Sequence, residues 1–139
     1  MEKPVIVGAM RTPIGCFMGT LKDKLAVDLG KVASQAAIER ADIKPEQIED
    51  VIAGMVYKVG VKGNPARQVQ LNLGIPAETV EVTVEQQCSS SMREMEIASQ
   101  QIMLGKSSTS LVVGMESMSR VPHFIMEARK GYRLGAKVE

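Results

Sequence analysis

Short apolar runs alternate with helical patterns along most of this 139-residue chain. Aliphatic, largely β-branched runs of this length indicate strands, and they occur at residues 4–10, 51–57, 80–84 and 110–115. Between them, apolar side chains recur every three or four residues, which predicts amphipathic helices, at residues 26–41, at 64–73 and from just after Cys88 to near Gly105. Alternation of this kind predicts an α/β domain in which helices pack on a sheet.

Helix-end signals agree with these boundaries. Asp42 can take the left-handed conformation that often ends a helix. Asn64 is a favourable N-terminal cap, and Pro65 suits the first helical position. The run at 51–57 is apolar almost throughout, which favours a strand buried on both faces in a parallel sheet. Residues 44–50 predict a single helical turn.

Composition and charge exclude several classes of protein. The formal net charge is +1 and the charged residues form no basic stripe, which argues against a nucleic-acid-binding protein. The apolar runs are too short to span a membrane, and the first residues lack the pattern of a secretory signal. Two distant cysteines and one histidine argue against a disulfide scaffold and against a metal site. We therefore expect a cytoplasmic protein with an aliphatic core to which its ten methionines contribute.

Cys88 stands where the run at 80–84 gives way to a helical pattern, in which Met92, Met95 and Ile102 share one face. A cysteine at the start of a helix has backbone N–H groups and the positive end of the helix dipole near its sulfur. Both stabilise a thiolate and so activate a nucleophile. Spacing alone leaves a second interpretation open, in which Cys88 is a buried and unreactive cysteine at a boundary.

Several motifs occur in one order along the chain. They are Arg11-Thr-Pro-Ile-Gly15, Ala26-Val-Asp-Leu-Gly30, Asn64-Pro-Ala-Arg-Gln68, Thr83-Val84 leading to Cys88-Ser-Ser, and Gly114-Met-Glu-Ser-Met-Ser119. In this order and at these spacings, the sequence resembles the thiolase family, the acyl-CoA C-acyltransferases, over essentially all of its 139 residues.

The resemblance implies a thiolase-like layered fold made of two α/β halves. This chain corresponds to the first, N-terminal half: a mixed sheet with packed helices at 1–119, followed at 120–139 by the start of a loop excursion. The alternating pattern does decay after Pro122. We expect the polypeptide to be an incomplete part of the fold, whose partner is the C-terminal half in the same longer chain or in a separate one.

The resemblance also makes Cys88 the acyl-carrying nucleophile, with its backbone N–H as one donor to the oxyanion. In the family, a thiolate attacks a carbonyl group of an acyl-CoA or a 3-oxoacyl-CoA, and a second CoA species then takes the acyl group from the enzyme. Coenzyme A and acyl-CoA are thus the implied substrates, with no tightly bound cofactor. Fatty acid metabolism and a homo-oligomer are the implied setting.

The family's other catalytic groups belong to the C-terminal half. They are an activating histidine, an asparagine and a second cysteine, and neither His123 nor Cys16 matches them. We expect His123 to serve packing or surface contact, and Cys16 to be a small buried residue. The chain alone is expected to be inactive, because it holds only one of the two oxyanion donors.

Two positions near Cys88 depart from the family pattern. Glu85 replaces the usual asparagine, and Ser91 replaces the usual glycine. A carboxylate near the sulfur disfavours the thiolate, and a serine adds bulk where a neighbouring element packs closely. These residues leave an alternative open, in which the chain is a non-catalytic thiolase-like subunit or a truncated fragment with an assembly role.

Glu116, directly after the last apolar run, also has two interpretations. It is either a buried brace that hydrogen-bonds to the absent half or a solvated carboxylate at a strand end. A nucleotide-binding α/β module is disfavoured as a third function, because no Gly-x-Gly-x-x-Gly or Gly-Lys-Ser/Thr loop follows a strand.

Overall fold

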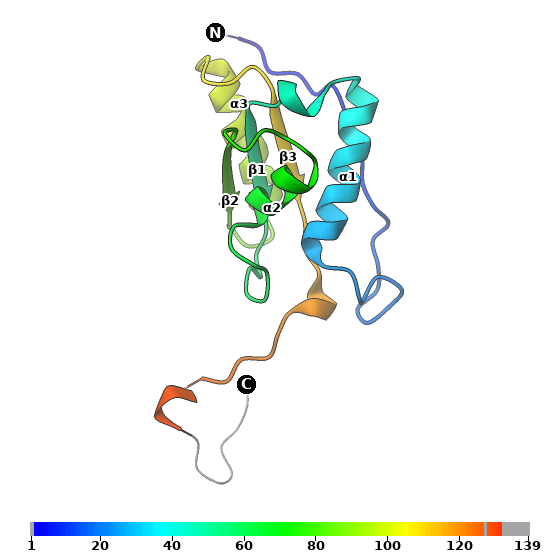
Figure 1. Ribbon diagram of the computed structural model, residues 1–139, viewed down its shortest axis with the longest axis vertical. Helices are drawn as coiled ribbons and strands as arrows, with labels where there is room; N and C mark the ends of the chain where they lie inside the picture. Colours follow the sequence, from blue (N-terminus) through cyan, green and yellow to red (C-terminus); the bar gives the residue numbers. More distant parts are fainter. Residues whose placement is uncertain (1, 127, 132–139) are drawn as a thin grey trace.

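Three parallel strands form the centre of the computed structural model, which describes residues 2–126 and 128–131. They are β1 (Asp50–Gly54), β2 (Val80–Val84) and β3 (Ser110–Gly114), in the order β2-β1-β3 (Figure 1). All five residues of β1 are buried, as its nearly continuous apolar sequence predicts for a central strand. β2 lies at one edge, and its side chains are exposed or half-buried.

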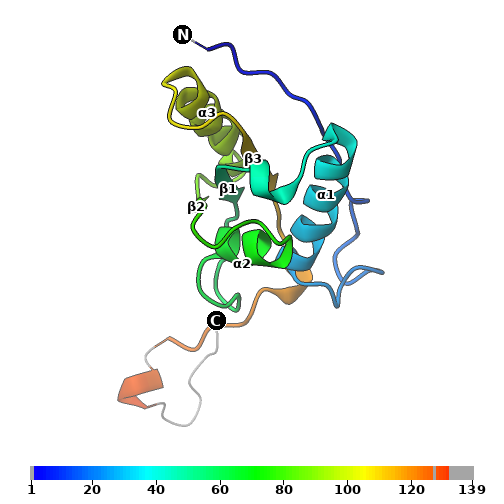
Figure 2. The ribbon, with the colours of Figure 1, turned by 45° about the horizontal axis from the view of Figure 1, so that its top comes forward.

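Helices cover both faces of this sheet. α1 (Ala26–Ala41) and α2 (Pro65–Asn72) lie on one face, and α3 (Ser90–Met103) lies on the other (Figures 1 and 2). The core between the sheet and the first two helices is aliphatic and contains two methionines. Its members include Val27, Ile38, Val51, Ala53, Met55, Ala66, Val69, Leu111, Val113 and Met115. The α/β half with packed helices is therefore confirmed, whereas the sheet, predicted to be mixed, has only parallel pairs among the described residues.

The predicted helix ends are confirmed as well. Asp42 follows α1 with a φ of 53°, in the left-handed region. The Asn64 side chain accepts a hydrogen bond from the Ala66 amide at 3.1 Å, and Pro65 is the first helical residue of α2. The single turn expected at 44–50 is the short 3₁₀ helix η1 (Pro45–Gln47).

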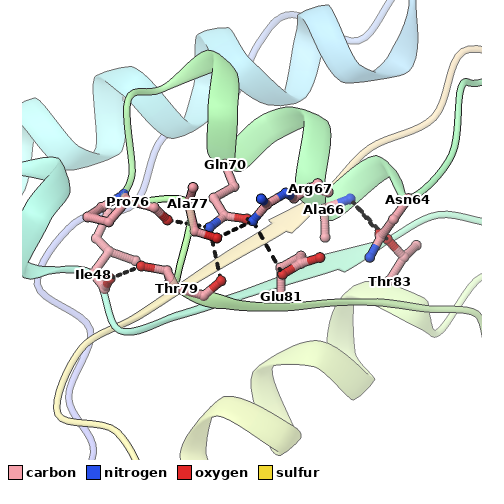
Figure 3. A network of polar contacts seen from close by, with 10 residues as sticks. All are labelled: Ile48, Asn64, Ala66, Arg67, Gln70, Pro76, Ala77, Thr79, Glu81 and Thr83. Atoms are coloured by element: carbon pink, nitrogen blue, oxygen red, sulfur yellow. Dashed lines mark hydrogen bonds and ion pairs between the residues drawn. The ribbon is translucent and has the colours of Figure 1, made fainter.

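A polar network ties α2 to β2 (Figure 3). Gln70 is fully buried and donates to the carbonyls of Pro76 at 2.6 Å and Thr79 at 2.9 Å. Arg67 donates to Gln70 at 3.0 Å and pairs with Glu81 of β2 at 3.9 Å. The network satisfies backbone carbonyls that burial would otherwise leave unpaired, and it orients the strand that leads to Cys88.

The strand predicted at 4–10 is wrong. The segment is extended but pairs with no strand among the described residues, and Val5, Ile6 and Val7 are 63–72% exposed. A cavity of about 300 Å³ separates it from Val112 of β3 and from α3. An apolar run predicts extended backbone, but a strand also needs a neighbour within hydrogen-bonding distance, and the run itself cannot supply one.

After β3 the chain leaves the sheet through the 3₁₀ helix η2 (Met118–Arg120) and then η3 (Ala128–Lys130) (Figure 1). The described residues of the segment at 120–139, predicted to begin a loop excursion, lie past the sheet; residues 127 and 132–139 are outside the described part. Within the described residues, no helix has both the length and the apolar character needed to cross a membrane.

Candidate functional site

Cys88 lies in a tight turn between the end of β2 and the start of α3, and it is exposed. Two backbone bonds close the turn: the Ser89 amide donates to the Gln86 carbonyl at 3.1 Å, and the Ser90 amide donates to the Gln87 carbonyl at 3.2 Å. Gln87, directly before the cysteine, has a φ of 53°. A non-glycine residue in this region is uncommon and is held by its surroundings.

The Ser90 hydroxyl locks this turn from the helix side. It accepts a hydrogen bond from the Gln86 amide at 2.9 Å and donates to the Gln87 carbonyl at 2.6 Å. Ser90 is itself 4% exposed. A hydroxyl can do both because it carries one donor and two acceptor positions. Sequence reasoning quoted Ser90 only as part of the motif around Cys88, and it missed this role.

Glu85 also contributes to the turn. One of its carboxylate oxygens accepts a hydrogen bond from the Gln87 amide at 2.9 Å. The side chain is exposed, so water can screen its charge from the cysteine. The residue that departs from the family pattern therefore has a structural role in the conformation before Cys88.

A pair of glycines lets α3 approach the sheet closely. Gly54 of β1 and Gly114 of β3 are register partners. A Cβ atom on Gly54 would lie 2.9 Å from the Ser90 carbonyl carbon and 3.0 Å from the Ser91 amide nitrogen. One on Gly114 would lie 2.9 Å from the Ser91 Cβ and would overlap its hydroxyl. We call Gly54 and Gly114 the glycine platform. It accommodates Ser91, whose bulk the family pattern called into question.

The buried face of α3 differs from the predicted one. Met92 and Met95 are 75% and 47% exposed, whereas the residues that face the sheet are Ser90, Glu94 and Ala98. The glycine platform explains the difference, because a helix seated so close to the strands has room only for short side chains in its first turn. Methionine is flexible and unbranched, so it tolerates the outer position.

A cavity of about 520 Å³ opens beside Cys88, where the carboxyl ends of the three strands meet. In open α/β sheets this end is where ligands bind. Its lining is mostly apolar with a few polar groups: Gly54, Met55, Val56, Tyr57, Gln87, Cys88, Ser90, Ser91, Gly114, Met115, Glu116 and Met118. The structure thus brings together the cysteine, the glycine platform and Glu116.

Glu116 braces one wall of this cavity. Its Oε2 accepts hydrogen bonds from the amides of Val56 at 2.9 Å and Tyr57 at 3.4 Å. Its Oε1 is buried and has no hydrogen-bond partner among the described residues. Of the two interpretations, the brace is the one found, but its partners belong to the segment after β1 in this same half.

Glu94 is the most deeply buried carboxyl group among the described residues, at 2% exposure. Burial raises its pKa to about 8, and backbone hydrogen bonding at Gly54 and Val113 opposes the shift. Its Oε2 is buried without a hydrogen-bond partner in the described part of the chain. Neither the helical pattern nor the motif comparison singled out this residue.

The remaining candidates lie elsewhere. Cys16 is exposed, so its predicted burial is wrong; it lies in the loop before α1, outside the packed elements. His123 is exposed and lies beyond η2, and it does not line the cavity beside Cys88. Across residues 2–126 and 128–131, no group of three or more histidine, cysteine, aspartate and glutamate side chains could hold a metal ion.

Comparison with known proteins decides the family. The N-terminal domain of thiolase matches residues 4–139. This chain belongs to the thiolase family. It is 44% identical over 130 residues to the cytosolic acetyl-CoA acetyltransferase ERG10 of Gibberella zeae, covering 94% of this chain and 33% of that protein. The chain spans about a third of the length of the curated relatives it matches.

Solved structures support the same family assignment. The acetyl-CoA acetyltransferase of Syntrophomonas wolfei superposes with a TM-score of 0.93 and 43% identity, over 97% of this chain and 34% of that one. The Acat5 thiolase of Ascaris suum, solved in complex with coenzyme A, superposes with a TM-score of 0.90 and 34% identity, over 99% and 36%. The prediction that this sequence is an N-terminal portion of a thiolase is confirmed.

Proposed function

We propose that this chain is the N-terminal part of a thiolase that moves an acyl group between acyl-CoA and CoA through a thioester on Cys88. The observation that carries the proposal is the position of Cys88: exposed, in a locked turn before α3, on the wall of a 520 Å³ cavity. The acetyl-CoA acetyltransferases among the relatives support acetyl-CoA as a substrate. Coenzyme A and acyl-CoA are then substrates, and no resident cofactor is required.

The chemistry begins with the Cys88 thiolate. Its sulfur attacks a carbonyl carbon, which is the thioester carbon of an acyl-CoA or the 3-oxo carbon of a 3-oxoacyl-CoA; an S–C bond forms, and the tetrahedral oxyanion collapses to release the leaving group. With acyl-CoA the leaving group is the CoA thiolate; with 3-oxoacyl-CoA it is the carbanion of the shortened CoA ester, which takes up a proton. The acyl group then passes to the incoming CoA thiol or to the carbanion of a second acyl-CoA.

The turn limits which backbone groups can stabilise the oxyanion. The amides of Ser89 and Ser90 already donate to the carbonyls of Gln86 and Gln87. We therefore assign the first donor to the Cys88 amide, and the second to the remainder of the fold. Loss of one oxyanion donor commonly slows acyl transfer by about 10²–10³-fold, so we propose that the chain alone has no measurable turnover.

The proposal extends to partners and setting. The C-terminal half, in the same longer chain or in another, supplies the acid and base groups. A homo-oligomer is supported by the exposed edge strand β2, where Val80 and Val82 are 67% and 40% exposed. We further propose a cytoplasmic protein of fatty acid metabolism, in which residues 1–119 form the α/β half and 120–139 begin the loop excursion.

Acyl transfer to Cys88 is tested by incubating the chain with excess acetyl-CoA and mapping acetylated peptides by mass spectrometry. We expect a hydroxylamine-sensitive acetyl group on Cys88 that is absent from Cys88→Ser and present in Cys16→Ser. Acetyl label on Cys16 alone, or on neither cysteine, would contradict the proposal.

The same experiment separates the second candidate, a non-catalytic thiolase-like subunit. Glu85 favours that candidate, since it stands where the family pattern has asparagine. If Glu85→Asn becomes acetylated and the natural chain does not, the natural sequence is the non-catalytic form. If both acetylate at similar rates, Glu85 is compatible with catalysis.

A further inference from the structure

We propose that Glu94 is a positioning residue for the Cys88 turn: its uncharged carboxyl group seats α3 on the glycine platform, and loss of its proton loosens the helix start. The proposal rests on the proposed function only in naming Cys88 as the reactive group. It concerns a residue that neither the motifs nor the cavity lining singled out.

The carboxyl group of Glu94 lies between α3 and the sheet. Ser90, Glu94 and Ala98 are the buried residues of α3, and their spacing of four places them on one face of the helix. The Oε1 of Glu94 lies 3.4 Å from where a Cβ on Gly114 would stand. Glu94 therefore lies one helical turn beyond the residues that touch the glycine platform, between α3 and the sheet.

Among the described residues, no cation compensates a negative charge on Glu94, and the backbone hydrogen bonding at Gly54 and Val113 lowers its pKa less than burial raises it. In the described part of the chain, no ion pair includes Glu94, and its Oε2 is buried without a hydrogen-bond partner. An unpaired carboxylate in such a place is strongly unfavourable, and a group of this kind keeps its proton instead. The burial of Glu94 thus favours the neutral acid at neutral pH, in keeping with its pKa of about 8.

Charged groups on the neighbouring elements do not change this conclusion. β3 carries no charged residue, and the segment at 4–8, which lines the cavity beside α3, carries none either. The remaining charged side chains on the neighbouring elements are distant or have partners. Asp50 lies at the opposite end of β1, Glu81 of β2 pairs with Arg67, and Arg93 pairs with Glu96 on the outer face of α3. Glu85 and Glu116 accept hydrogen bonds from backbone amides. Cys88 itself is exposed.

Glu94 is connected to the nucleophile through the first turn of α3. The first turn of α3 contacts Gly54 and Gly114, and Ser90 in that turn holds both Gln86 and Gln87 by its hydroxyl. Cys88 is the next residue after that pair. If Glu94 ionises, its carboxylate draws water toward the α3–sheet contact, and the Ser90 bonds that fix the turn are weakened with it.

Hydrogen–deuterium exchange of the peptide spanning residues 86–94 tests this directly. After correction for the intrinsic pH dependence of exchange, we expect its protection in the natural chain to fall about tenfold between pH 6 and pH 7 and to level off above pH 8. Glu94→Gln keeps the shape and cannot ionise, so its protection should stay level. Glu96→Gln, on the exposed face, is the matched control and should behave like the natural chain.

Two further measurements keep the proposal falsifiable if Glu94→Gln does not fold. A carbon NMR titration of the natural chain should show the Glu94 carboxyl changing near pH 8; a midpoint near 4.5 overturns the proposal. The pH profile of Cys88 alkylation by iodoacetamide should differ between natural chain and Glu94→Gln above pH 8, and identical profiles overturn it. None of these readouts needs acyl transfer, so failure of the proposed function is detected separately, by the acetylation experiment.

Discussion

At the scale of single residues, Cys88 and Cys16 offer an internal comparison. Both thiols are exposed, so access does not distinguish them. Only Cys88 stands just before the N-terminus of a helix, at the positive end of its dipole. Which of the two is a nucleophile therefore depends on the local field.

We expect Cys88 to react with iodoacetamide faster than Cys16 near neutral pH, because the thiolate is the reacting form. Peptide mass mapping over a time course measures both rates in one sample. The single variants Cys88→Ser and Cys16→Ser confirm the assignment of each peptide. Equal rates for the two cysteines would contradict an activated nucleophile.

Glu94 gives a second prediction at this scale, on stability. Its pKa is about 8 in the folded chain against an ordinary value of 4.5, so the folded state holds the proton more tightly. The stabilisation that the protonated Glu94 side chain contributes is therefore fully present below pH 4.5, and it is lost as the pH rises through about 8. By linkage, the free energy of unfolding at pH 7 is lower than that below pH 4.5 by on the order of 3 kcal/mol.

Thermal unfolding at a series of pH values measures this loss. Between pH 5 and 8, the melting temperature of Glu94→Gln should fall less than that of the natural chain. Burial also raises the pKa of Asp50, but Asp50 is common to both proteins, so their difference isolates Glu94. Parallel pH curves for the two proteins would show that Glu94 does not hold a proton in the folded state.

At the scale of elements, the contact between α3 and the sheet depends on two glycines and one serine. Gly114→Ala places a methyl group against the Ser91 side chain, and such overpacking typically costs about 1–3 kcal/mol. Ser91→Gly removes the side chain that would clash. We therefore expect the double variant to recover much of the loss, measured as a positive coupling in a urea-unfolding double-mutant cycle.

Gly54→Ala is the matched control for this cycle. A Cβ there meets the Ser90 carbonyl carbon and the Ser91 amide, which are backbone atoms that no side-chain substitution removes. Ser91→Gly should therefore fail to rescue Gly54→Ala. Equal rescue of both alanine variants would mean that the close approach of α3 is not what the glycine platform provides.

At the scale of the whole molecule, the chain displays apolar surface that an α/β half would normally cover. Val5 and Ile6 are 70% and 72% exposed near the edge of β3 that pairs with no strand among residues 2–126 and 128–131, and Val80 is 67% exposed on β2. Exposed apolar patches and open strand edges promote association. We expect the isolated chain to self-associate, seen as a sedimentation coefficient that rises with concentration. A clean monomer at all concentrations would contradict this expectation.

Local sequence was sufficient for most of the elements. The Asn64–Pro65 cap, the left-handed Asp42 and the apolar run of β1 act within a few residues, so their outcome follows from local chemistry. The motif order was sufficient for the family. The turn that carries Cys88 was predicted as a strand–helix junction, because a period of two changes there to a period of 3.6.

What the sequence by itself determined is therefore the α/β alternation, the family and the place of the cysteine in the chain. Only the tertiary structure decided which face of α3 is buried, that Glu94 lies against Gly114, that residues 4–10 pair with no strand in the described part of the chain, and that Cys16 is exposed. The physical reason is distance along the chain. The glycine platform brings residues 54, 90, 91 and 114 into contact. These residues are far apart in the sequence, so no local pattern predicts how closely the helix approaches the two strands.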